Sequence, residues 1–438
     1  MCLDSIMNIC YTENVWHILK KRKDQMYIQK TLSNGIRVAA EHIPYVKSVS
    51  VGVWVGNGSR YERAEENGIS HFIEHMVFKG TYTRTARDIA LEMDSVGGQL
   101  NAFTTRECTC FYARVLNEFA DTALDILSDM IFSPLLSEED MDLERRVVTE
   151  EIAMYSDSPE DVVYDMFDAA VWGDTPMGRP ILGTCETLAR ITPDVMREYM
   201  KTHYTSKNIV IAVAGCFTDE IFDKLEKYFG SHELPDNEVK CEPAVYTPKD
   251  SVLCRDFEQV QLVYGFNGID IYDESVYSLL VFNNVFGSGM SSRLFQNIRE
   301  KYGLAYSIGA GHSAYIGVGT FDISAAVSPE NTEKVTELVL KEVERLARDR
   351  LTDSEIERAR IQLKGNYLLS NEHPDARMQA LGRATLLGRR LMTPEETIEK
   401  IEAVNRSSVG EMIDRVLDLK TICVAATGPI DSVDGLVR

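Results

Sequence analysis

The chain has 438 residues, of which 44% are hydrophobic and 26% charged, and a net charge of −22 at neutral pH. This length exceeds what one hydrophobic core usually supports and predicts two or three domains of ordinary globular composition. The negative charge opposes binding to nucleic acid or anionic membranes, and no apolar run reaches the ~20 residues of a transmembrane helix. We therefore expect neither a nucleic-acid partner nor a membrane partner.

Residues 1–28 begin with acidic and polar residues and carry their basic cluster late, which is the wrong order for a secretory signal. Arginine is too scarce there for a transit peptide. We expect a poorly structured N-terminal extension, for which an upstream start codon would be one origin. The nine cysteines are irregularly spaced and predict free thiols in a reducing compartment, so we expect a cytoplasmic protein.

The most distinctive segment is HFIEHMVFKGT, in which His71, Glu74 and His75 spell H-x-x-E-H. On a helix, positions 71 and 75 lie one turn apart on one face, so two neutral imidazoles can bind one zinc ion. Glu74 lies on the turn between them, beside the position that a catalytic zinc leaves open. This arrangement suits metal-assisted hydrolysis, and the order is that of the inverzincin signature. The alternative is a helix with two packed or solvated histidines.

Residues 96–115, VGGQLNAFTTRECTCFYARV, follow the motif. They predict a glycine turn, a strand, a short turn and a second strand. Residues 117–131 then predict a helix of ordinary length.

A long helix is predicted over residues 137–168. The apolar residues at helical spacing that indicate it are Leu143, Val147, Ile152 and Met154. We expect a third zinc ligand on this helix, since a catalytic zinc site typically has three protein ligands.

Glu144 and Glu151 lie seven residues apart on this helix and therefore share a face. We assign Glu151, 76 residues after His75, as the third ligand. We assign Glu144 to the second shell, where it would hold an imidazole through its other ring nitrogen. Glu150 competes with Glu151 but points about 100° away on the helix. A solvated acidic helix is the alternative for the whole segment.

The chain looks like a duplicated unit with an offset of about 205 to 213 residues. A strand, a glycine turn and a helix in residues 48–80 recur in residues 260–289. A β-rich run that ends in glycine at 208–215 recurs at 421–428. The segment between the halves, residues 231–251, is polar and contains three prolines, so it predicts a linker.

The duplication predicts a first half over residues 29–230 and a second half over residues 252–438. With an offset of 207, the three motif residues fall on Ser278, Val281 and Phe282, so the second half has no metal site and the chain would hold one zinc ion. A helix is also predicted over 331–349. We expect an α+β fold of two homologous halves, each with an antiparallel-rich sheet and helices packed on one face.

The H-F-I-E-H-M-V-F-K-G-T segment, followed about 75 residues later by E-R-R-V-V-T-E-E, resembles the pitrilysin family of zinc metallopeptidases. More narrowly, it resembles the branch of mitochondrial processing peptidase and its bacterial relatives. The resemblance runs from about Gln29 to the C-terminus and includes residues 101–112, 176–184 and 291–308. It implies that Zn²⁺ is held by His71, His75 and Glu151, with Glu74 as the general base.

The resemblance also implies substrate contacts in the first half. In relatives the strand that contains Asn101, Ala102 and Phe103 is a sheet edge near the zinc, and the peptide adds to it as an extra strand. An ordinary hairpin is the alternative. Acidic residues at the positions of Asp161 and Asp165 bind a substrate arginine in the mitochondrial relatives. The alternative for these two residues is a solvated acidic pair.

In the second half, Arg299 and Tyr306 match a pair that reaches the scissile region in active relatives. There the arginine contacts substrate backbone and the tyrosine stabilises the oxyanion. The segment VFGSGMSSRLF has only two glycines, whereas the noncatalytic processing-peptidase subunit carries a long glycine-rich loop. The chain therefore resembles the catalytic type.

These observations predict a zinc endopeptidase that cleaves short or unfolded, basic peptides in an enclosed chamber. Since single-chain relatives of double length contain four units, a chain with two units would form a homodimer. A catalytically silent peptide-binding or structural subunit is the main alternative. A zinc-binding protein without proteolytic activity is the third.

Overall fold

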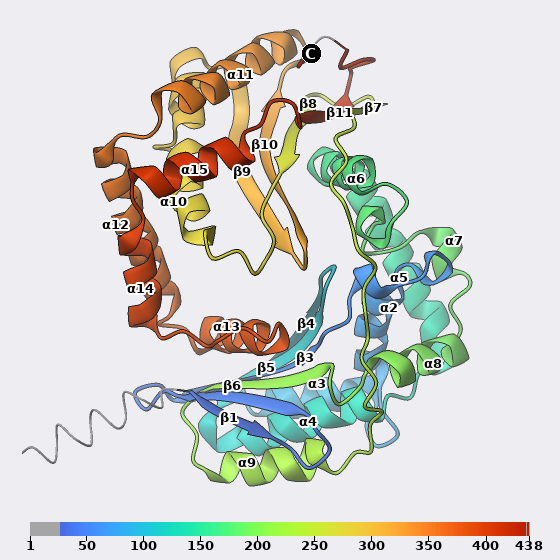
Figure 1. Ribbon diagram of the computed structural model, residues 1–438. Helices are drawn as coiled ribbons and strands as arrows, with labels where there is room; N and C mark the ends of the chain where they lie inside the picture. The colour runs from blue at the N-terminus through green and yellow to red at the C-terminus, as the bar shows by residue number, and fades with distance from the viewer. Residues whose placement is uncertain (1–26, 435, 438) are drawn as a thin grey trace, which may run out of the picture.

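Two β-sheets organise the computed structural model, which describes residues 27–434, 436 and 437 (Figure 1). The first sheet has the strand order β1-β2-β6-β3-β5-β4. Its strands are β1 (Ile28–Thr31), β2 (Arg37–His42), β3 (Ser48–Val55), β4 (Gln99–Thr104), β5 (Thr109–Leu116) and β6 (Ile209–Gly215). The second sheet has the order β7-β11-β8-β10-β9. Its strands are β7 (Ser251–Cys254), β8 (Val260–Asn267), β9 (Ala305–Tyr315), β10 (Val318–Val327) and β11 (Cys423–Gly428).

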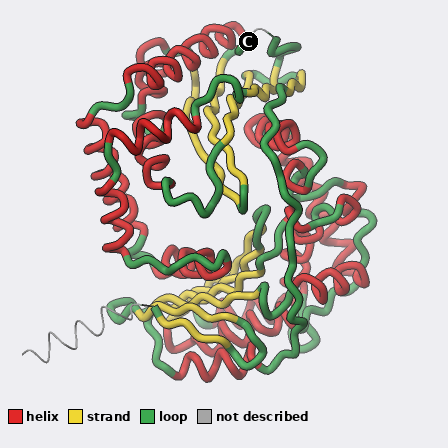
Figure 2. Tube along the Cα trace, in the orientation of Figure 1, coloured by secondary structure: helices red, strands yellow, loops and turns green. Residues whose placement is uncertain are grey.

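Helices surround both sheets (Figure 2). Those before the second sheet are α2 (Ile69–Met76), α3 (Ala86–Ser95), α4 (Ala120–Phe132), α5 (Glu138–Ser156), α6 (Pro159–Trp172), α7 (Cys185–Leu188), α8 (Pro193–His203) and α9 (Glu220–Leu225). Those that follow are α10 (Val276–Phe286), α11 (Thr332–Asp349), α12 (Asp353–Ser370), α13 (Pro374–Leu386), α14 (Pro394–Ala403) and α15 (Arg406–Val416).

The predicted duplication is confirmed by the topology of the sheets. Strands β2-β6-β3-β5-β4 of the first sheet match β7-β11-β8-β10-β9 of the second, position by position. In both sheets the first of these pairs is parallel and the other three are antiparallel. The chain is therefore an α+β protein of two homologous halves with antiparallel-rich sheets, as predicted.

Each half covers one face of its sheet with its own helices. In the first half, α2, α4 and α8 contribute to one large apolar core with strands β2, β3, β5 and β6. In the second half, α10, α11 and α15 form the matching core against β8, β10 and β11. The other face of each sheet is also apolar, so it too must be covered.

The two halves exchange a helix: each half contributes one helix that covers the remaining face of the other half's sheet (Figure 1). Helix α13 packs on the first sheet, where Met378 and Leu381 meet Trp54. Helix α6 packs on the second sheet, where Phe167 meets Val263. The two halves are therefore held together by their cores and not only by the connection between them.

Glycines on the central strands allow both exchanged helices to approach closely. A Cβ atom added at Gly52 of β3 would collide with the Met378 side chain, and one added at Gly265 of β8 would collide with the Phe167 ring. Gly52 and Gly265 are 213 residues apart, as are the strand-ending glycines Gly215 and Gly428. The exchange thus follows the internal symmetry of the duplication.

A buried ionic cluster fixes the β9–β10 hairpin to the first half. The Arg60 guanidinium donates to Glu107 Oε1 at 2.5 Å and to the Ile316 carbonyl oxygen at 2.9 Å. The Ile316 N–H also donates to Glu107 Oε1, at 2.8 Å. Because Arg60 is buried, removal of either charge would leave its partner desolvated, and the hairpin tip is held firmly in place.

The prediction of one long helix after residue 137 is wrong. The single long helix is two helices, α5 and α6, because Ser158 caps the second and Pro159 occupies its first position. Of the apolar residues that indicated this helix, Leu143, Val147 and Met154 are exposed, whereas Ile152 packs against the core of the first half. The buried residues of α5 are Met141, Glu144 and Val148.

The predicted extension, residues 1–28, lies outside the described residues except for Tyr27 and Ile28, and Ile28 begins β1. The boundaries 29–230, 231–251 and 252–438 remain predictions. Residues 233–250 contain neither helix nor strand. Within the described part of the chain, we find no helix with the length and apolar character that a membrane span requires.

Candidate active site

Helix α2 presents the H-x-x-E-H motif because its apolar residues face the core of the first half. Ile69, Phe72, Ile73 and Met76 are fully buried there. Because these side chains point into the core, the motif residues on the other faces of the helix point toward α5 and β4. The short helix is thus oriented by its own hydrophobic side.

The N-terminus of α2 is held by a buried carboxylate, Glu62. Its Oε2 accepts the backbone N–H of Gly68 at 2.8 Å, and its Oε1 accepts that of Ser70 at 2.9 Å. These are donors that a helix leaves unpaired at its start, and a carboxylate also suits the positive end of the helix dipole. Sequence analysis missed Glu62, since nothing in its spacing marks it as a cap.

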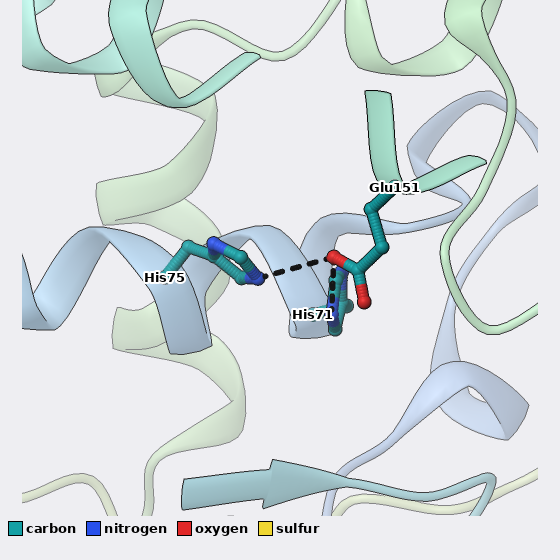
Figure 3. Close-up of side chains that lie close together, drawn as sticks. All are labelled: His71, His75 and Glu151. Carbon is teal, nitrogen blue, oxygen red and sulfur yellow. Dashed lines mark ion pairs between the residues drawn. The ribbon is translucent and has the colours of Figure 1, made fainter. Parts of the chain in front are cut away.

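His71, His75 and Glu151 converge from α2 and α5 (Figure 3). Glu151 Oε2 lies 3.7 Å from His71 Nε2 and 3.5 Å from His75 Nε2. One donor atom from each residue lies within 4.8 Å of the other two. The competing residue, Glu150, is exposed on another side of α5.

This donor set fits a zinc ion. Two imidazole nitrogens and one carboxylate oxygen are a ligand combination of catalytic zinc sites, and the three atoms already face one another. Burial, followed by the charge of His75, lowers the pKa of His71 to about 4. His71 is therefore neutral at physiological pH, which is the form that binds a metal.

Glu144 and Lys79 hold His75 in place. Glu144 Oε2 lies 3.1 Å from His75 Nδ1, on the side of the ring opposite Glu151. The other Glu144 oxygen forms an ion pair with the Lys79 ammonium group. Glu144 is thus buried but neutralised, and it contacts the His75 imidazole from the side away from Glu151. Lys79 was missed, although it follows His75 by four residues.

Glu74 lies between the metal ligands and strand β4. The Thr104 hydroxyl donates to Glu74 Oε2 at 2.5 Å. Burial raises the pKa of Glu74, and the hydrogen bond from Thr104 opposes this effect. Thr104 was also missed by sequence analysis, because β4 is 30 residues away from the motif in the sequence.

Strand β4, which contains Asn101, Ala102 and Phe103, is the outer strand of the first sheet. The Ala102 N–H donates to the Asn101 side-chain oxygen at 2.8 Å instead of to a neighbouring strand. The strand therefore has an open edge next to Glu74. Phe103 and Thr104 also line a cavity of about 1030 Å³ between the two halves.

Asp161 and Asp165 lie on α6 rather than on α5, the helix of Glu151. Burial, followed by the charge of Glu151, raises the pKa of Tyr155. The charges of Asp161 and Asp165 raise it further, so both carboxylates lie near the same phenol. Asp165 lines the cavity; partial burial raises its pKa, and Arg106 lowers it.

The structure does not bring Arg299 and Tyr306 to this cluster. Arg299 lies over the Phe295 ring in the π-helical turn Phe295–Glu300, at 4.7 Å from its centroid. Tyr306 is 72% exposed at the start of β9. The hairpin that touches the first half is at the other end of β9, about 30 Å of extended strand away. Among the described residues, neither side chain contacts His71, His75 or Glu151.

Comparison with known proteins agrees with the fold. Two family models match the chain: insulinase (peptidase family M16) over residues 37–185, and the peptidase M16 inactive domain over residues 190–363. YmxG of Bacillus subtilis, named an uncharacterized zinc protease, is 43% identical over 379 residues, which cover 86% of this chain and 93% of YmxG. A protein of Rickettsia felis with the same description is 37% identical over 411 residues, covering 93% and 99%.

The fold is also that of a solved structure described as a protease from Helicobacter pylori. Its TM-score is 0.87 at 19% identity, and the match covers 92% of this chain and 99% of the other. The two family models and the relatives named zinc proteases define the class as metallopeptidase. The chain belongs to peptidase family M16, the insulinase or pitrilysin family.

We predict that His71→Ala, His75→Ala and Glu151→Ala each lose most bound zinc, because each removes one ligand. Glu144→Ala should weaken zinc binding by about ten- to a hundredfold, as the loss of a group behind a ligand does. Zinc content and competition with a chelator measure both effects. Glu150→Ala, one residue along α5, is the control that keeps its zinc. Full occupancy in Glu151→Ala would contradict the assignment.

Proposed function

We propose that this protein is a zinc-dependent endopeptidase that cleaves short or unfolded, basic peptides. The observation that carries the proposal is the convergence of His71, His75 and Glu151 beside Glu74, at the open edge of β4. A catalytically silent subunit would not need a complete set of metal donors, nor a buried carboxylate that contacts one of the donor imidazoles. The geometry therefore favours the enzyme over the two non-catalytic alternatives.

The proposed chemistry is a proton transfer by Glu74. Zinc, when held by the three ligands, supplies a Lewis acid that polarises the scissile carbonyl and makes water more acidic. Glu74 accepts a proton from the attacking water and later donates it to the leaving amine. The Thr104 hydroxyl bonds to one oxygen of Glu74 and leaves the other free for that proton.

The peptide is proposed to bind as an extra strand along β4. Main-chain groups of Asn101, Ala102 and Phe103 would pair with the peptide backbone, which makes binding tolerant of sequence. The Asn101 side chain, which now occupies the Ala102 N–H, would have to move aside. Because the edge ends at Thr104, a peptide bound along it passes directly beside Glu74.

Asp161 and Asp165 are proposed to bind a basic side chain of the peptide. The charges of both act on Tyr155, which follows Glu151 by one turn on α5, and Asp165 lines the cavity. Two carboxylates around one guanidinium make a stronger contact than a single exposed ion pair. The net charge of −22 would also attract basic peptides to the protein.

A cytoplasmic homodimer with an enclosed chamber completes the proposal. Tyr306 is too exposed and too far along β9 to serve the metal site of its own chain. In a two-fold dimer it could instead face the metal site of the other subunit. Arg299 would contact substrate backbone there, and the Tyr306 phenol would stabilise the oxyanion.

Glu74→Gln should keep its zinc and bind peptides but lose nearly all turnover, because the amide cannot accept the proton of water. Cleavage of a quenched fluorescent peptide measures the rate, and fluorescence polarisation measures binding. Glu150→Gln, which is exposed on α5, should cleave at the native rate. Near-native turnover by Glu74→Gln would rule out this mechanism.

The double variant Asp161→Asn with Asp165→Asn should lose most of the preference for basic peptides. The quantity to compare is the ratio of kcat/KM for one peptide and its arginine-to-alanine version. Glu160→Gln with Asp174→Asn removes the same charge from exposed positions and should keep the ratio. Equal ratios in the wild type and the first double variant would show that the two aspartates are solvated surface.

A mixing experiment tests the role of Tyr306. Glu74→Gln and Tyr306→Phe proteins should each be weakly active alone. If Tyr306 serves the other subunit, each mixed dimer has one complete site, and exchange of subunits should restore about a quarter of wild-type activity. No recovery, with mixed dimers demonstrated by differently tagged chains, would contradict a role between subunits.

A further inference from the structure

The cavity between the halves has two sides of opposite charge. It is bounded by the end of β4, the β9–β10 hairpin, α6 and α13. The side next to α6 carries Asp165 and Asp168 and lies toward the proposed basic-residue site. The side next to α13 carries Arg37, Lys207 and Arg383. Only the acidic side has a role in the function proposed above.

The cations on the α13 side are not neutralised, whereas Arg106 on the acidic side is. Arg106 forms an ion pair with Asp168 at 2.6 Å. The Arg37 guanidinium instead bonds only to main-chain carbonyl oxygens, those of Thr385 at 2.7 Å and Lys207 at 3.2 Å. Among the described residues, none of these three cationic side chains forms an ion pair; Glu107, which also lines the cavity, is paired with Arg60.

Arg383 is the most available of these groups. Within the residues that the structure describes, its guanidinium makes no hydrogen bond, ion pair or ring contact, and the same holds for the Lys207 ammonium group. Arg383 is an exposed residue of α13 that lines the cavity, so its guanidinium is accessible to an anion that enters it.

His312 on β9 adds a neutral donor to this wall. It lines the same cavity as Arg383. Burial first, and the nearby charge of Arg383 second, lower the pKa of His312. It is therefore uncharged near pH 7 and can donate one N–H. Trp54 and Phe103 of the same cavity supply apolar surface that strengthens ionic contacts by excluding water.

We propose that Arg383, Lys207 and His312 form a binding site for a carboxylate of the peptide substrate. The planar guanidinium of Arg383 would bind the carboxylate through two parallel hydrogen bonds, with the lysine and histidine as additional donors. This inference rests on the proposed peptidase function. It adds a second point of selection: a peptide bound along β4 would place a basic residue at α6 and a carboxylate at α13.

Two sources of the carboxylate are possible, an Asp or Glu side chain and the C-terminus of the peptide. One peptide series carries a single Asp moved along the sequence, each member paired with its Asn version. A second pair has the same sequence with a free C-terminal acid or an amide. Each peptide is tested for kcat/KM with the wild-type enzyme and for binding to Glu74→Gln protein.

The wild type should prefer at least one carboxylate peptide over its neutral partner by about tenfold or more, as expected for hydrogen bonds to a charged group. Arg383→Gln should reduce this ratio to near one, and Lys207→Gln should reduce it by less. Arg358→Gln, an exposed arginine on α12 without a polar partner in the described chain, is the matched control and should keep the ratio. Thermal unfolding checks that each variant is folded.

Equal kcat/KM values of the wild type for the carboxylate and the neutral member of every pair would overturn the proposal. An unchanged ratio in folded Arg383→Gln, or an equal loss in Arg358→Gln, would overturn it as well. Failure of the carboxylate site and failure of the peptidase function can be told apart. If Glu74→Gln protein binds carboxylate peptides more tightly than their neutral partners through Arg383, while the wild type cleaves no peptide, the peptidase function is wrong and the carboxylate site is supported.

Discussion

The constraint on which the structure depends is that each sheet has two apolar faces and each half covers only one with its own helices. Helices α6 and α13 cross over to cover the others. Each large side chain buried there, such as Met378 or Phe167, contributes about 1.5–3 kcal/mol. The exchange therefore makes the two halves one cooperative unit and places the end of β4, the β9–β10 hairpin and both exchanged helices around one cavity.

The metal site depends on this frame through α5. Only two residues separate the end of α5 from the start of α6, which packs on the second sheet, so α5 with Glu151 is held beside the exchanged helix. The other end of the site is fixed by α2, whose apolar side is buried and whose N-terminus Glu62 caps. Two separately anchored helices thus carry the three proposed zinc ligands and set their positions.

The two copies of the duplicated unit have diverged in a physically consistent way. The residues of the second half that match the motif positions include Val281 and Phe282, and both are fully buried in its core. A half without metal donors can use the corresponding helix for packing. The contributions proposed for it are surfaces, among them the cavity wall with His312 and Arg383 and the exposed Tyr306.

The sequence by itself determined what helical and strand spacing controls: His71 and His75 on one face, Glu151 rather than Glu150 facing them, and the duplicated strands. These follow from local geometry. The tertiary structure alone decided the exchange of α6 and α13, the outward direction of Leu143 and Val147, and the contacts of Glu74 with Thr104 and of Glu144 with Lys79. Such contacts depend on how distant segments pack, and spacing along one element carries no information about that packing.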